Sequence, residues 1–336
     1  MTASERFLVT GALGCIGAWV IRQLVREGVD VVALDVGGSD HRLRQVLSAS
    51  DLAGLERVEC DITDLDALAA VVGSRAITRV IHLAALQVPF CRADPALGAR
   101  VNVVGVVNVF EAVKTAGGIA GPVVYASSVA AYDATDIIGG AFEGVEPSGH
   151  ASTHYGVYKL ANEGTARVYW SDDLIPSIGL RPYVVYGVGR DQGMTASPTL
   201  AMLAAAAGRP YTISYSGRSH FQLAADVAAS FIAAARSEFR GADVFNLGGA
   251  VVDMADVVAA IDVSCPAAAG LITIDGPALP FPAEVDHERF AREVAPEPST
   301  PLLEGVRSTV ALFADLCHSG DVNPDTMLGP MRESGR

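Results

Sequence analysis

The sequence predicts an α/β protein with a doubly wound parallel sheet and a small C-terminal cap. In the first half, short β-branched runs alternate with amphipathic stretches, a pattern typical of βαβ units whose sheet is covered on both faces. After about residue 182 the alternation weakens, and glycine and proline become frequent, as expected of a smaller unit that covers a cleft. Half of the 336 residues are hydrophobic, which is enough to build a large core.

This alternation gives the expected elements in chain order. Strands are expected over residues 7–10, 29–34, 57–60, 79–83, 122–127 and 175–181, with helices over 14–27, 65–72, 97–116 and 154–170. In the second part, helices are expected over 197–207, 225–235, 254–261 and 301–317, and strands over 211–214 and 244–247. We assign residues 1–182 to the main domain and 183–320 mainly to the cap, with some of its elements able to extend the main sheet. Residues 321–336 are expected to form a loose polar tail.

The amino-acid composition limits which binding partners and which cellular compartment are expected for this protein. The net charge of −14 argues against nucleic acid and anionic membranes as partners. The five cysteines are scattered without metal-ligand spacing, which favours reduced thiols in a cytoplasm and argues against a metal site. The apolar runs are too short to cross a membrane, and the first strand follows the N-terminus too closely for a signal peptide. We expect a cytoplasmic protein that binds a small polar molecule.

A glycine-rich turn follows the first expected strand. Residues 10–17 read TGALGCIG, which places Gly11, Gly14 and Gly17 around the start of the first helix. Glycines let the backbone approach a pyrophosphate, and the helix N-terminus favours its negative charge. The spacing differs from the commoner GxGxxG. Its place between a strand and a helix nevertheless predicts the dinucleotide site of a Rossmann fold, with Cys15 and Ile16 in the same turn.

Asp35 ends the second expected strand, beyond this turn. A carboxylate there accepts hydrogen bonds from the ribose hydroxyls of an adenosine and repels a 2′-phosphate. The following residues, 36–38, are Val-Gly-Gly and include no arginine that could bind such a phosphate. Asp35 therefore predicts NAD as the cofactor; a solvated aspartate in a turn is the alternative.

Tyr155 and Lys159 stand four residues apart in the segment YGVYK. Positions i and i+4 share one face of a helix, so the phenol and the ammonium are expected side by side, while Tyr158 points elsewhere. A nearby cation lowers the pKa of a phenol, so that Tyr155 could serve as a general acid–base. The alternative is a chance pair, but its place on the helix after the fifth strand argues against chance.

Ser127 and Ser128 end the fifth expected strand. Ligands bind beyond the carboxyl ends of parallel strands, where a hydroxyl can hydrogen-bond a substrate oxygen. Serines at strand ends also serve as turn formers or helix caps. Because Tyr155 and Lys159 are expected nearby, a role of the two serines in the site is favoured.

Together these motifs resemble the extended short-chain dehydrogenases/reductases, the group that includes the NAD-dependent epimerase/dehydratase family. The resemblance runs from Phe7 to about Cys317. The motifs that carry it are TGALGCIG, Asp35, Asp61-Ile62, the segment HLAA at residues 82–85, Asn102, the serine pair and YGVYK.

The resemblance implies roles for individual residues. Asp61 and Ile62 would hold the adenine, Leu83, Ala84 and Ala85 would run along the NAD, and Asn102 would belong to the same cofactor-binding set. Ser128, rather than Ser127, would be the catalytic hydroxyl beside the acid–base Tyr155, and Lys159 would also bind the nicotinamide ribose. The helices expected over 97–116 and 154–170 would pair across a two-fold axis in a homodimer.

Departures from the family pattern limit the reaction. Dehydratases place an acidic pair directly after the catalytic hydroxyl, whereas Val129 and Ala130 follow Ser128 here. Nucleotide-sugar epimerases usually carry an asparagine where this chain has Val184. They also carry an arginine where it has Ser219, next to Arg218. Dehydration and a UDP-sugar substrate are therefore disfavoured.

The leading hypothesis is an NAD-dependent oxidoreductase that transfers a hydride at a secondary hydroxyl of a sugar, sugar acid or similar polyol. The candidate substrate contacts are Gln87, Ser127, Ser128 and Arg190. Weaker candidates, more often surface or packing residues, are His154, His220 and Arg218. One alternative is a nucleotide-sugar 4-epimerase with tightly bound NAD. Another, of a different class, is a catalytically silent NAD-binding regulatory protein.

Overall fold

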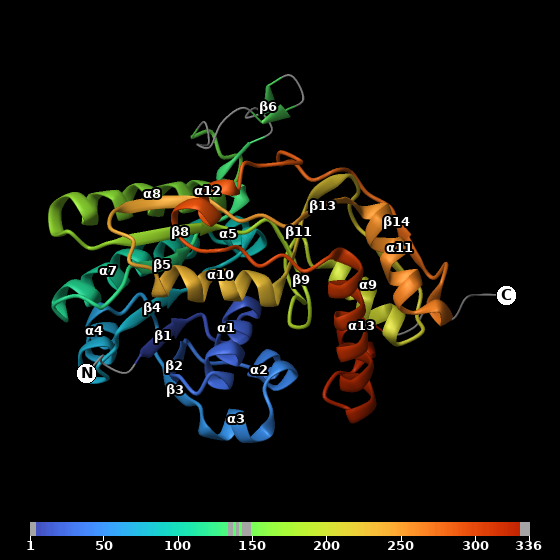
Figure 1. The fold of residues 1–336 in the computed structure, drawn as a ribbon, viewed down its shortest axis with the longest axis horizontal. Coiled ribbons are helices and arrows are strands. Elements are labelled where there is room, and N and C mark those ends of the chain that lie inside the picture. The colour runs from blue at the N-terminus through green and yellow to red at the C-terminus, as the bar shows by residue number, and fades with distance from the viewer. Residues whose placement is uncertain (1–4, 134–136, 139–140, 143–148, 330–336) are drawn as a thin grey trace.

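The structure, a computed structural model, describes residues 5–133, 137–138, 141–142 and 149–329. Residues 1–4, which precede the first strand, and residues 330–336 of the predicted tail lie outside the described residues. Figure 1 shows a helix-covered sheet with a further group of helices and strands at one end.

The central sheet has seven strands in the order β12-β8-β5-β4-β1-β2-β3, and all of its pairings are parallel. Its strands are β1 (Arg6–Thr10), β2 (Asp30–Asp35), β3 (Glu56–Glu59), β4 (Arg79–His82), β5 (Val123–Ala126), β8 (Ser177–Arg181) and β12 (Ala242–Asn246). The predicted doubly wound α/β fold is confirmed, and the strand predicted over 244–247 extends the main sheet as β12. The order reverses between β1 and β4, and a ligand crevice is expected at such a reversal.

Alternate residues of the strands face opposite layers of the protein. Along β1, Phe7 and Val9 belong to one buried cluster, whereas Leu8 belongs to the other. The first cluster packs against α1 (Cys15–Arg26) and α10 (Ala224–Arg236), and the second against α4 (Leu65–Ser74), α7 (Gly105–Thr115) and α8 (His154–Asp173). Because successive side chains of a strand point to opposite faces, both faces of this sheet are buried.

The helix predicted over 97–116 is interrupted. It consists of α6 (Pro95–Ala99), a π-helical turn over Arg100–Val104, and α7. By length and composition alone, the segment Pro95–Thr115 could cross a membrane. Half of its most apolar window is buried inside the protein, as in the core helix of a parallel-sheet domain.

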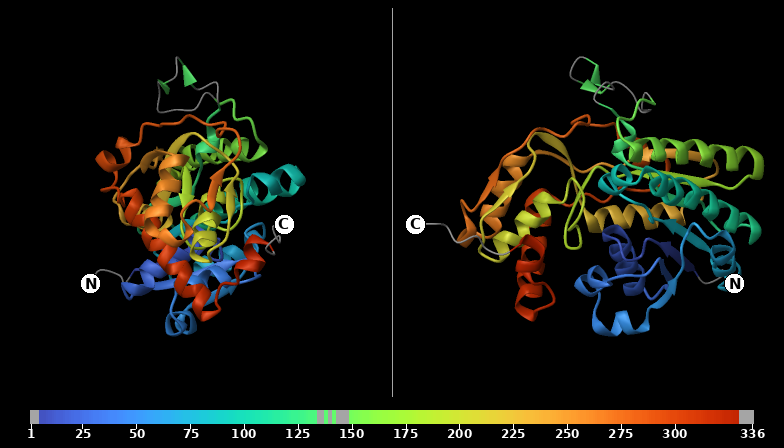
Figure 2. Two further views of the ribbon diagram at one scale, coloured as in Figure 1. Left: turned by 90° about the vertical axis from the view of Figure 1, so that its right-hand side faces the viewer. Right: turned by 180° about the vertical axis from the view of Figure 1, so that it is seen from behind.

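The elements beyond the main sheet gather at one end of the molecule, as Figures 1 and 2 show. They are β9 (Val184–Tyr186), α9 (Ser197–Ala206), β10 (Tyr211–Ile213), β11 (Arg218–Leu223), β13 (Ala250–Asp253), α11 (Met254–Ser264), β14 (Ile272–Ile274) and α13 (Leu302–Ser319). Helix α13 packs against α9 and α11. The remaining short elements are α2 (His41–Val46), α3 (Ala49–Gly54), α5 (Val88–Ala93), β6 (Ile137–Ile138), β7 (Ala141–Phe142), α12 (Glu288–Glu293), α14 (Pro324–Leu328) and 3₁₀ turns at Val129–Ala131 and Pro266–Ala268.

The segment predicted as a loose tail is ordered in its first part. Val322 is buried, and α14 follows it. Arg209 donates hydrogen bonds to the carboxylate of Asp325 at 2.8 Å and to the carbonyl oxygen of Gly329 at 2.6 Å. The prediction of a loose tail from residue 321 is therefore wrong up to residue 329, because a buried arginine holds a segment that is polar in composition.

A buried ion pair joins α8 to the central sheet. Arg181 at the end of β8 donates to both carboxylate oxygens of Glu163 on α8, from Nε at 2.8 Å and from Nη2 at 2.7 Å. Nη1 of Arg181 donates to the hydroxyl of Tyr132 at 3.0 Å, and that hydroxyl donates to Asn246 on β12. The side chains of Arg181 and Glu163 are 1% and 2% exposed, so their charges depend on each other.

We expect Arg181→Met to destabilise the fold strongly, because it leaves the Glu163 carboxylate buried without its partner. Breaking a buried pair typically lowers the free energy of unfolding by about 3–5 kcal/mol. Urea unfolding would measure the loss. The matched control is Arg292→Met, which removes an exposed arginine from a surface pair with Glu293 and should cost less than about 1 kcal/mol. Equal losses for the two variants would contradict this account of the pair.

Candidate active site

A groove of about 720 Å³ opens at the carboxyl ends of the central strands. It runs past the ends of β1, β2, β4 and β5 and reaches the loop that follows β9. Its lining contains all but one of the residues predicted to bind the cofactor or to act in catalysis. These are Gly11, Gly14, Cys15, Ile16, Gly17, Asp35, Asp61, Ile62, Leu83, Ala84, Ala85, Ser128, Tyr155 and Lys159.

The glycine-rich turn lies where two backbones meet. Gly11 has a φ of +69°, and a Cβ there would come within 2.5 Å of the backbone nitrogen of Ala84 on the neighbouring strand's loop. A Cβ at Gly17 would lie 2.3 Å from the carbonyl oxygen of Gly11. No side chain caps the first turn of α1, so its free N–H groups face the groove. The turn therefore fits a pyrophosphate, as the sequence predicted.

Asp35 stands beside this turn. Its carboxylate accepts hydrogen bonds from the backbone N–H groups of Leu13 and Val36, both at 2.9 Å. Burial raises the pKa of Asp35, and these two hydrogen bonds and the charge of Arg42 oppose that rise. The carboxylate retains acceptor capacity toward the groove, which suits the hydroxyls of a ribose.

Arg42 of α2 was not foreseen at this end of the groove. It lies seven positions beyond Asp35, further along the chain than residues 36–38, where a phosphate-binding arginine was expected if there were one. The guanidinium donates to the carbonyl oxygen of Leu13 at 3.0 Å and to the carboxylate of Asp191 at 2.6 and 3.0 Å. His41 also contacts Asp191, at 2.7 Å. Arg42 is therefore already paired, and the preference expected from Asp35 stands.

Asn102 is the predicted cofactor residue that does not line the groove. It is buried, and its side-chain amide bonds the backbone N–H and carbonyl oxygen of Leu86 at 2.7 and 2.8 Å. Its own carbonyl oxygen accepts a hydrogen bond from Asn162 on α8. The structure thus corrects this assignment: Asn102 fixes the loop after β4, and Leu86 in that loop lines the groove.

Tyr155, Ser128 and Lys159 come together at the other end of the groove. The Ser128 side chain lies close enough to the Tyr155 hydroxyl to lower its pKa. The ammonium of Lys159 lies 5.2 Å from the centre of the Tyr155 ring and donates to the carbonyl oxygen of Ala126 at 2.6 Å. The pairing predicted from YGVYK is therefore present. Tyr158 points away and donates to Pro95 at 2.8 Å.

The electrostatics of this trio differ from the prediction. Burial raises the pKa of Tyr155, and the nearby Ser128 side chain and the charge of Arg190 only partly oppose this. Lys159 was expected to lower that pKa, but it is not among the groups that shift it; its ammonium lies over the ring and bonds Ala126. Burial also lowers the pKa of Lys159 to about 8, so the loss of water dominates for both groups.

Ser127 has a different role from its neighbour. Its hydroxyl donates to the carboxylate of Glu163 in the buried network below the groove. Ser127 also lines the groove, so its contact with the substrate stays a prediction, although its hydroxyl proton is already given to Glu163. Ser128 faces Tyr155 and also caps the short 3₁₀ turn that follows it.

Of the remaining substrate candidates, two line the groove and three do not. Gln87 and Arg190 face it near Tyr155. His154 is exposed and stacks on Tyr158, and Arg218 forms an exposed ion pair with Glu284. His220 is buried and bonded to the backbone of Gly249 and Val285.

Several groove residues escaped the sequence analysis. They are Phe90, Tyr183, Asp191 and Gln192, in addition to Arg42. Asp191 and Gln192 belong to a loop in which Gly187, Gly189 and Gly193 have positive φ angles of 127°, 90° and 97°. The three closely spaced glycines in the sequence could have indicated a loop whose backbone adopts positive φ angles.

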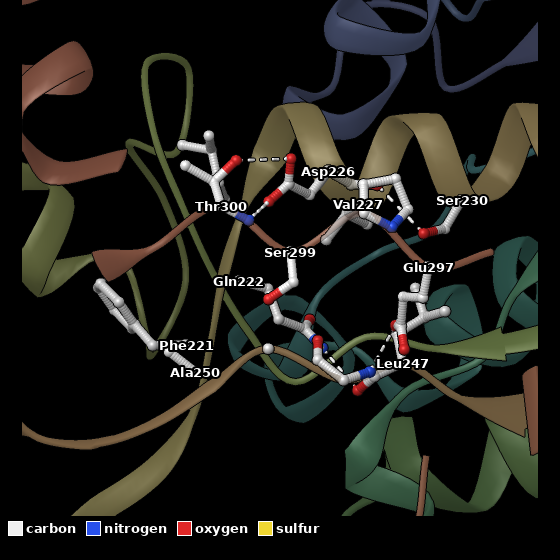
Figure 3. A pocket seen from close by; sticks show the side chains of 14 residues that line it. Phe221, Gln222, Asp226, Val227, Ser230, Leu247, Ala250, Glu297, Ser299 and Thr300 are labelled. Atoms are coloured by element: carbon white, nitrogen blue, oxygen red, sulfur yellow. Dashed lines mark hydrogen bonds between the residues drawn. The ribbon is translucent and has the colours of Figure 1, made fainter. Parts of the chain in front are cut away.

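A second cavity, shown in Figure 3, is much smaller and lies between β11, α10 and residues 297–300. Its volume of about 10 Å³ suits a single water molecule. Thr300 donates to Asp226 at 2.7 and 3.0 Å, and Gly248 donates to Glu297 at 2.6 Å, so its main polar groups are already bonded. This cavity is a small gap in the packing between these elements and not a ligand site. Among the described residues, no group of three His, Cys, Asp or Glu is placed to hold a metal ion.

Comparisons with known proteins agree with this site. Residues 7–248 match the NAD dependent epimerase/dehydratase family. The chain is 29% identical over 332 residues to a UDP-glucose 4-epimerase of Mycolicibacterium smegmatis, covering 92% of this chain and 98% of that protein. It is 32% identical over 226 residues to UDP-glucuronate 4-epimerase 1 of Arabidopsis thaliana, covering 65% of this chain but only about half (51%) of that protein.

Among solved structures, a partial consensus L-threonine 3-dehydrogenase has a TM-score of 0.79. The two proteins are 22% identical in sequence, and the match covers 93% of this chain and 100% of the dehydrogenase. At this identity the likeness supports the fold alone. The family match spans the glycine-rich turn, Asp35 and the Ser128–Tyr155–Lys159 trio. The chain therefore belongs to the NAD-dependent epimerase/dehydratase family and is an NAD-dependent enzyme with a Rossmann fold.

Proposed function

We propose that this enzyme interconverts a secondary hydroxyl and a ketone on a sugar, sugar acid or similar polyol. The observation that carries the proposal is the contact of Tyr155 with Ser128 and Lys159 at the end of a groove whose other end fits a dinucleotide. When bound, NAD supplies the hydride acceptor. In the oxidation direction, the carbon loses a hydride, the hydroxyl loses its proton to Tyr155, and a C=O bond forms.

The chain's own residues divide this work. Ser128 can hydrogen-bond the substrate oxygen together with Tyr155 and steady the charge that develops on it. Lys159 is held by Ala126 with its ammonium against the Tyr155 ring, where it can reach a ribose of the cofactor. We also propose that residues 183–320, apart from β12, α10 and α12, which belong to the central sheet and its covering layer, form the substrate-binding cap. The loop carrying Arg190 would be its contribution to the groove.

A nucleotide-sugar 4-epimerase is the second candidate, supported by the names of the two relatives in sequence. Two positions argue against it. Val184 lies buried in β9 and Ser219 lies buried in β11, so neither offers the amide or the cation that such enzymes use on the nucleotide. Arg218, the nearest arginine to that position, is exposed and paired with Glu284. A silent regulatory protein is disfavoured because the trio is intact.

A screen of sugars, sugar acids and polyols with NAD tests the proposal. An oxidoreductase accumulates NADH in proportion to product, whereas an epimerase interconverts substrates with no net NADH. Epimerisation of UDP-glucose without NADH release would place the second candidate first. The absence of both reactions across the screen would favour the silent protein.

We expect Tyr155→Phe to lower kcat by about 10²–10⁴-fold, the usual contribution of a general acid–base. The ring remains, so NAD affinity should change little. Steady-state kinetics and NAD titration measure the two effects. The control is Tyr158→Phe, which removes only the hydrogen bond to Pro95.

Lys159→Met should behave differently from Tyr155→Phe, by weakening NAD binding as well as slowing turnover. Near-normal turnover in Tyr155→Phe, or equal damage from Tyr158→Phe, would show that the acid–base has been assigned to the wrong residue.

We expect the enzyme to bind NAD more tightly than NADP, because the Asp35 carboxylate repels a 2′-phosphate and Arg42 is occupied by Asp191. Asp35→Asn keeps an acceptor for the Leu13 N–H but removes the charge. It should therefore reduce the preference without unfolding the turn. Fluorescence titration with both cofactors measures it. Tighter binding of NADP to the unsubstituted enzyme would refute the role given to Asp35.

We propose a cytoplasmic homodimer in which α7 and α8 of the two copies pack together. Val157 and Val168 of α8 are about half exposed and lie eleven positions apart, which places them on one face of the helix. Leu97 and Val104 form a similar exposed pair on the neighbouring segment. Light scattering should give a molar mass twice that of the monomer. Val168→Glu should lower the measured mass toward that of the monomer. A monomer at micromolar concentration would count against this interface.

A further inference from the structure

Arg190 lines the groove and has no acidic partner among the residues that the structure describes. Its guanidinium donates to the hydroxyl of Thr195 at 2.9 Å, which fixes its direction. Its Nε is buried and has no hydrogen-bond partner among the described residues. An arginine stays charged even when partly buried, and the outer N–H groups of its guanidinium remain donors for an anion in the groove.

Gln87 faces the same space from the loop after β4. Its Oε1 is buried and likewise lacks a partner within the described part of the chain. Gly193 lies between the two side chains. A Cβ at this glycine would come 2.3 Å from Oε1 of Gln87 and 3.3 Å from Nη2 of Arg190. The two side chains therefore approach each other beside Gly193, and both residues also line the groove that contains Tyr155; the part of the groove next to them is the candidate subsite.

The charges around this subsite do not balance. Asp191, the next residue, is bound by Arg42 and His41, and Glu163 is bound by Arg181. The other acidic residues of the groove, Asp35 and Asp61, follow β2 and β3 at the adenosine end. Lys159 adds a second cation beside Tyr155. The substrate end of the groove is thus positive in a protein whose net charge is −14.

We propose that Arg190 binds a carboxylate of the substrate, so that the enzyme acts on a hydroxy acid whose secondary hydroxyl reaches Tyr155. This inference rests on the proposed oxidation of a hydroxyl and names the substrate class. A guanidinium has a planar fork of donors that matches the two oxygens of a carboxylate, and Gln87 can bond a neighbouring hydroxyl. Arg190 is then a specificity-determining residue.

The cofactor is another source of negative charge. Arg190 lies close enough to Cys15 in the glycine-rich turn to lower the pKa of that thiol, which burial raises to about 11. The pyrophosphate of a dinucleotide is expected at this turn. The test must therefore separate binding of the substrate from binding of NAD.

The test compares acids with matched alcohols. The enzyme loaded with NAD is titrated by calorimetry with D-gluconate against D-sorbitol, D-glucuronate against D-glucose, and glycerate against glycerol. In each pair the members differ chiefly in the carboxylate. We expect at least one acid to bind more tightly than its alcohol. Arg190→Ala should weaken that acid about 10–100-fold and leave the alcohols and NAD within about twofold.

Two further variants sharpen the comparison. Arg190→Lys keeps the charge without the fork and should give an intermediate affinity. Arg92→Ala is the matched control, because Arg92 is exposed near the end of α5 and is absent from the groove lining. It removes the same charge and should change nothing. Three results would each overturn the inference: no acid preferred over its alcohol, equal losses of acid and NAD in Arg190→Ala, or equal losses in Arg92→Ala.

Turnover is read separately from binding, so that the two proposals can fail independently. If an acid binds through Arg190 but neither NADH nor an epimer forms, the proposed function fails and the carboxylate subsite stands. If a polyol is oxidised but its acid is neither bound nor oxidised better than the matched alcohol, or if Arg190→Ala leaves the acid unaffected, the proposed function stands and the subsite fails.

Discussion

The buried pair between Arg181 and Glu163 sets the position of the catalytic helix. Tyr155, Lys159 and Glu163 follow one another at intervals of four residues, so they share one side of α8. The bidentate contact with β8 fixes the rotation and the height of this helix against the sheet. Lys159 can then reach Ala126 at the end of β5, and Tyr155 can reach Ser128. A buried pair adds little net stability against an apolar substitute, so its value here is the geometry that it imposes.

A second constraint ties the substrate end of the groove to the cofactor end. The loop after β9 bonds α1 through Trp19, whose indole donates to the carbonyl oxygen of Val188 at 2.9 Å. Asp191 in the same loop binds Arg42, which in turn holds the carbonyl of Leu13 beside Asp35. The residues that face the substrate are therefore positioned by the turn that faces the pyrophosphate. A short chain of direct contacts therefore links the residues at the cofactor end of the groove to those at the substrate end.

The sequence predicted the parts of the site whose geometry is local. Tyr155 and Lys159 meet because four residues separate them on one helix, and Gly11 and Asp35 are found because they end neighbouring parallel strands. The sequence did not predict contacts that depend on which of several partners, remote in the chain, a side chain bonds. Ser127 turns to Glu163, thirty-six positions away, and Asn102 turns to Leu86. Arg42 and Asp191 are 149 positions apart, so no pattern in the sequence could pair them. The central sheet was predictable because its strands are short, continuous apolar runs that alternate with helical stretches, which is a local signal.

The partial burial of Tyr155 connects these constraints to catalysis. Burial disfavours the phenolate and raises the pKa of Tyr155, which by itself makes the residue a weak base. The same loss of water strengthens any cation placed beside it, because charges interact more strongly where the effective dielectric constant is low. Arg190 already opposes the rise, whereas Lys159 has its ammonium turned to Ala126. If Arg190 is neutralised by a substrate carboxylate, its help to the phenolate diminishes, and Lys159 together with bound oxidised NAD would supply the remaining positive charge. The balance of charge in this groove would then favour proton removal by Tyr155 when the oxidised cofactor is present.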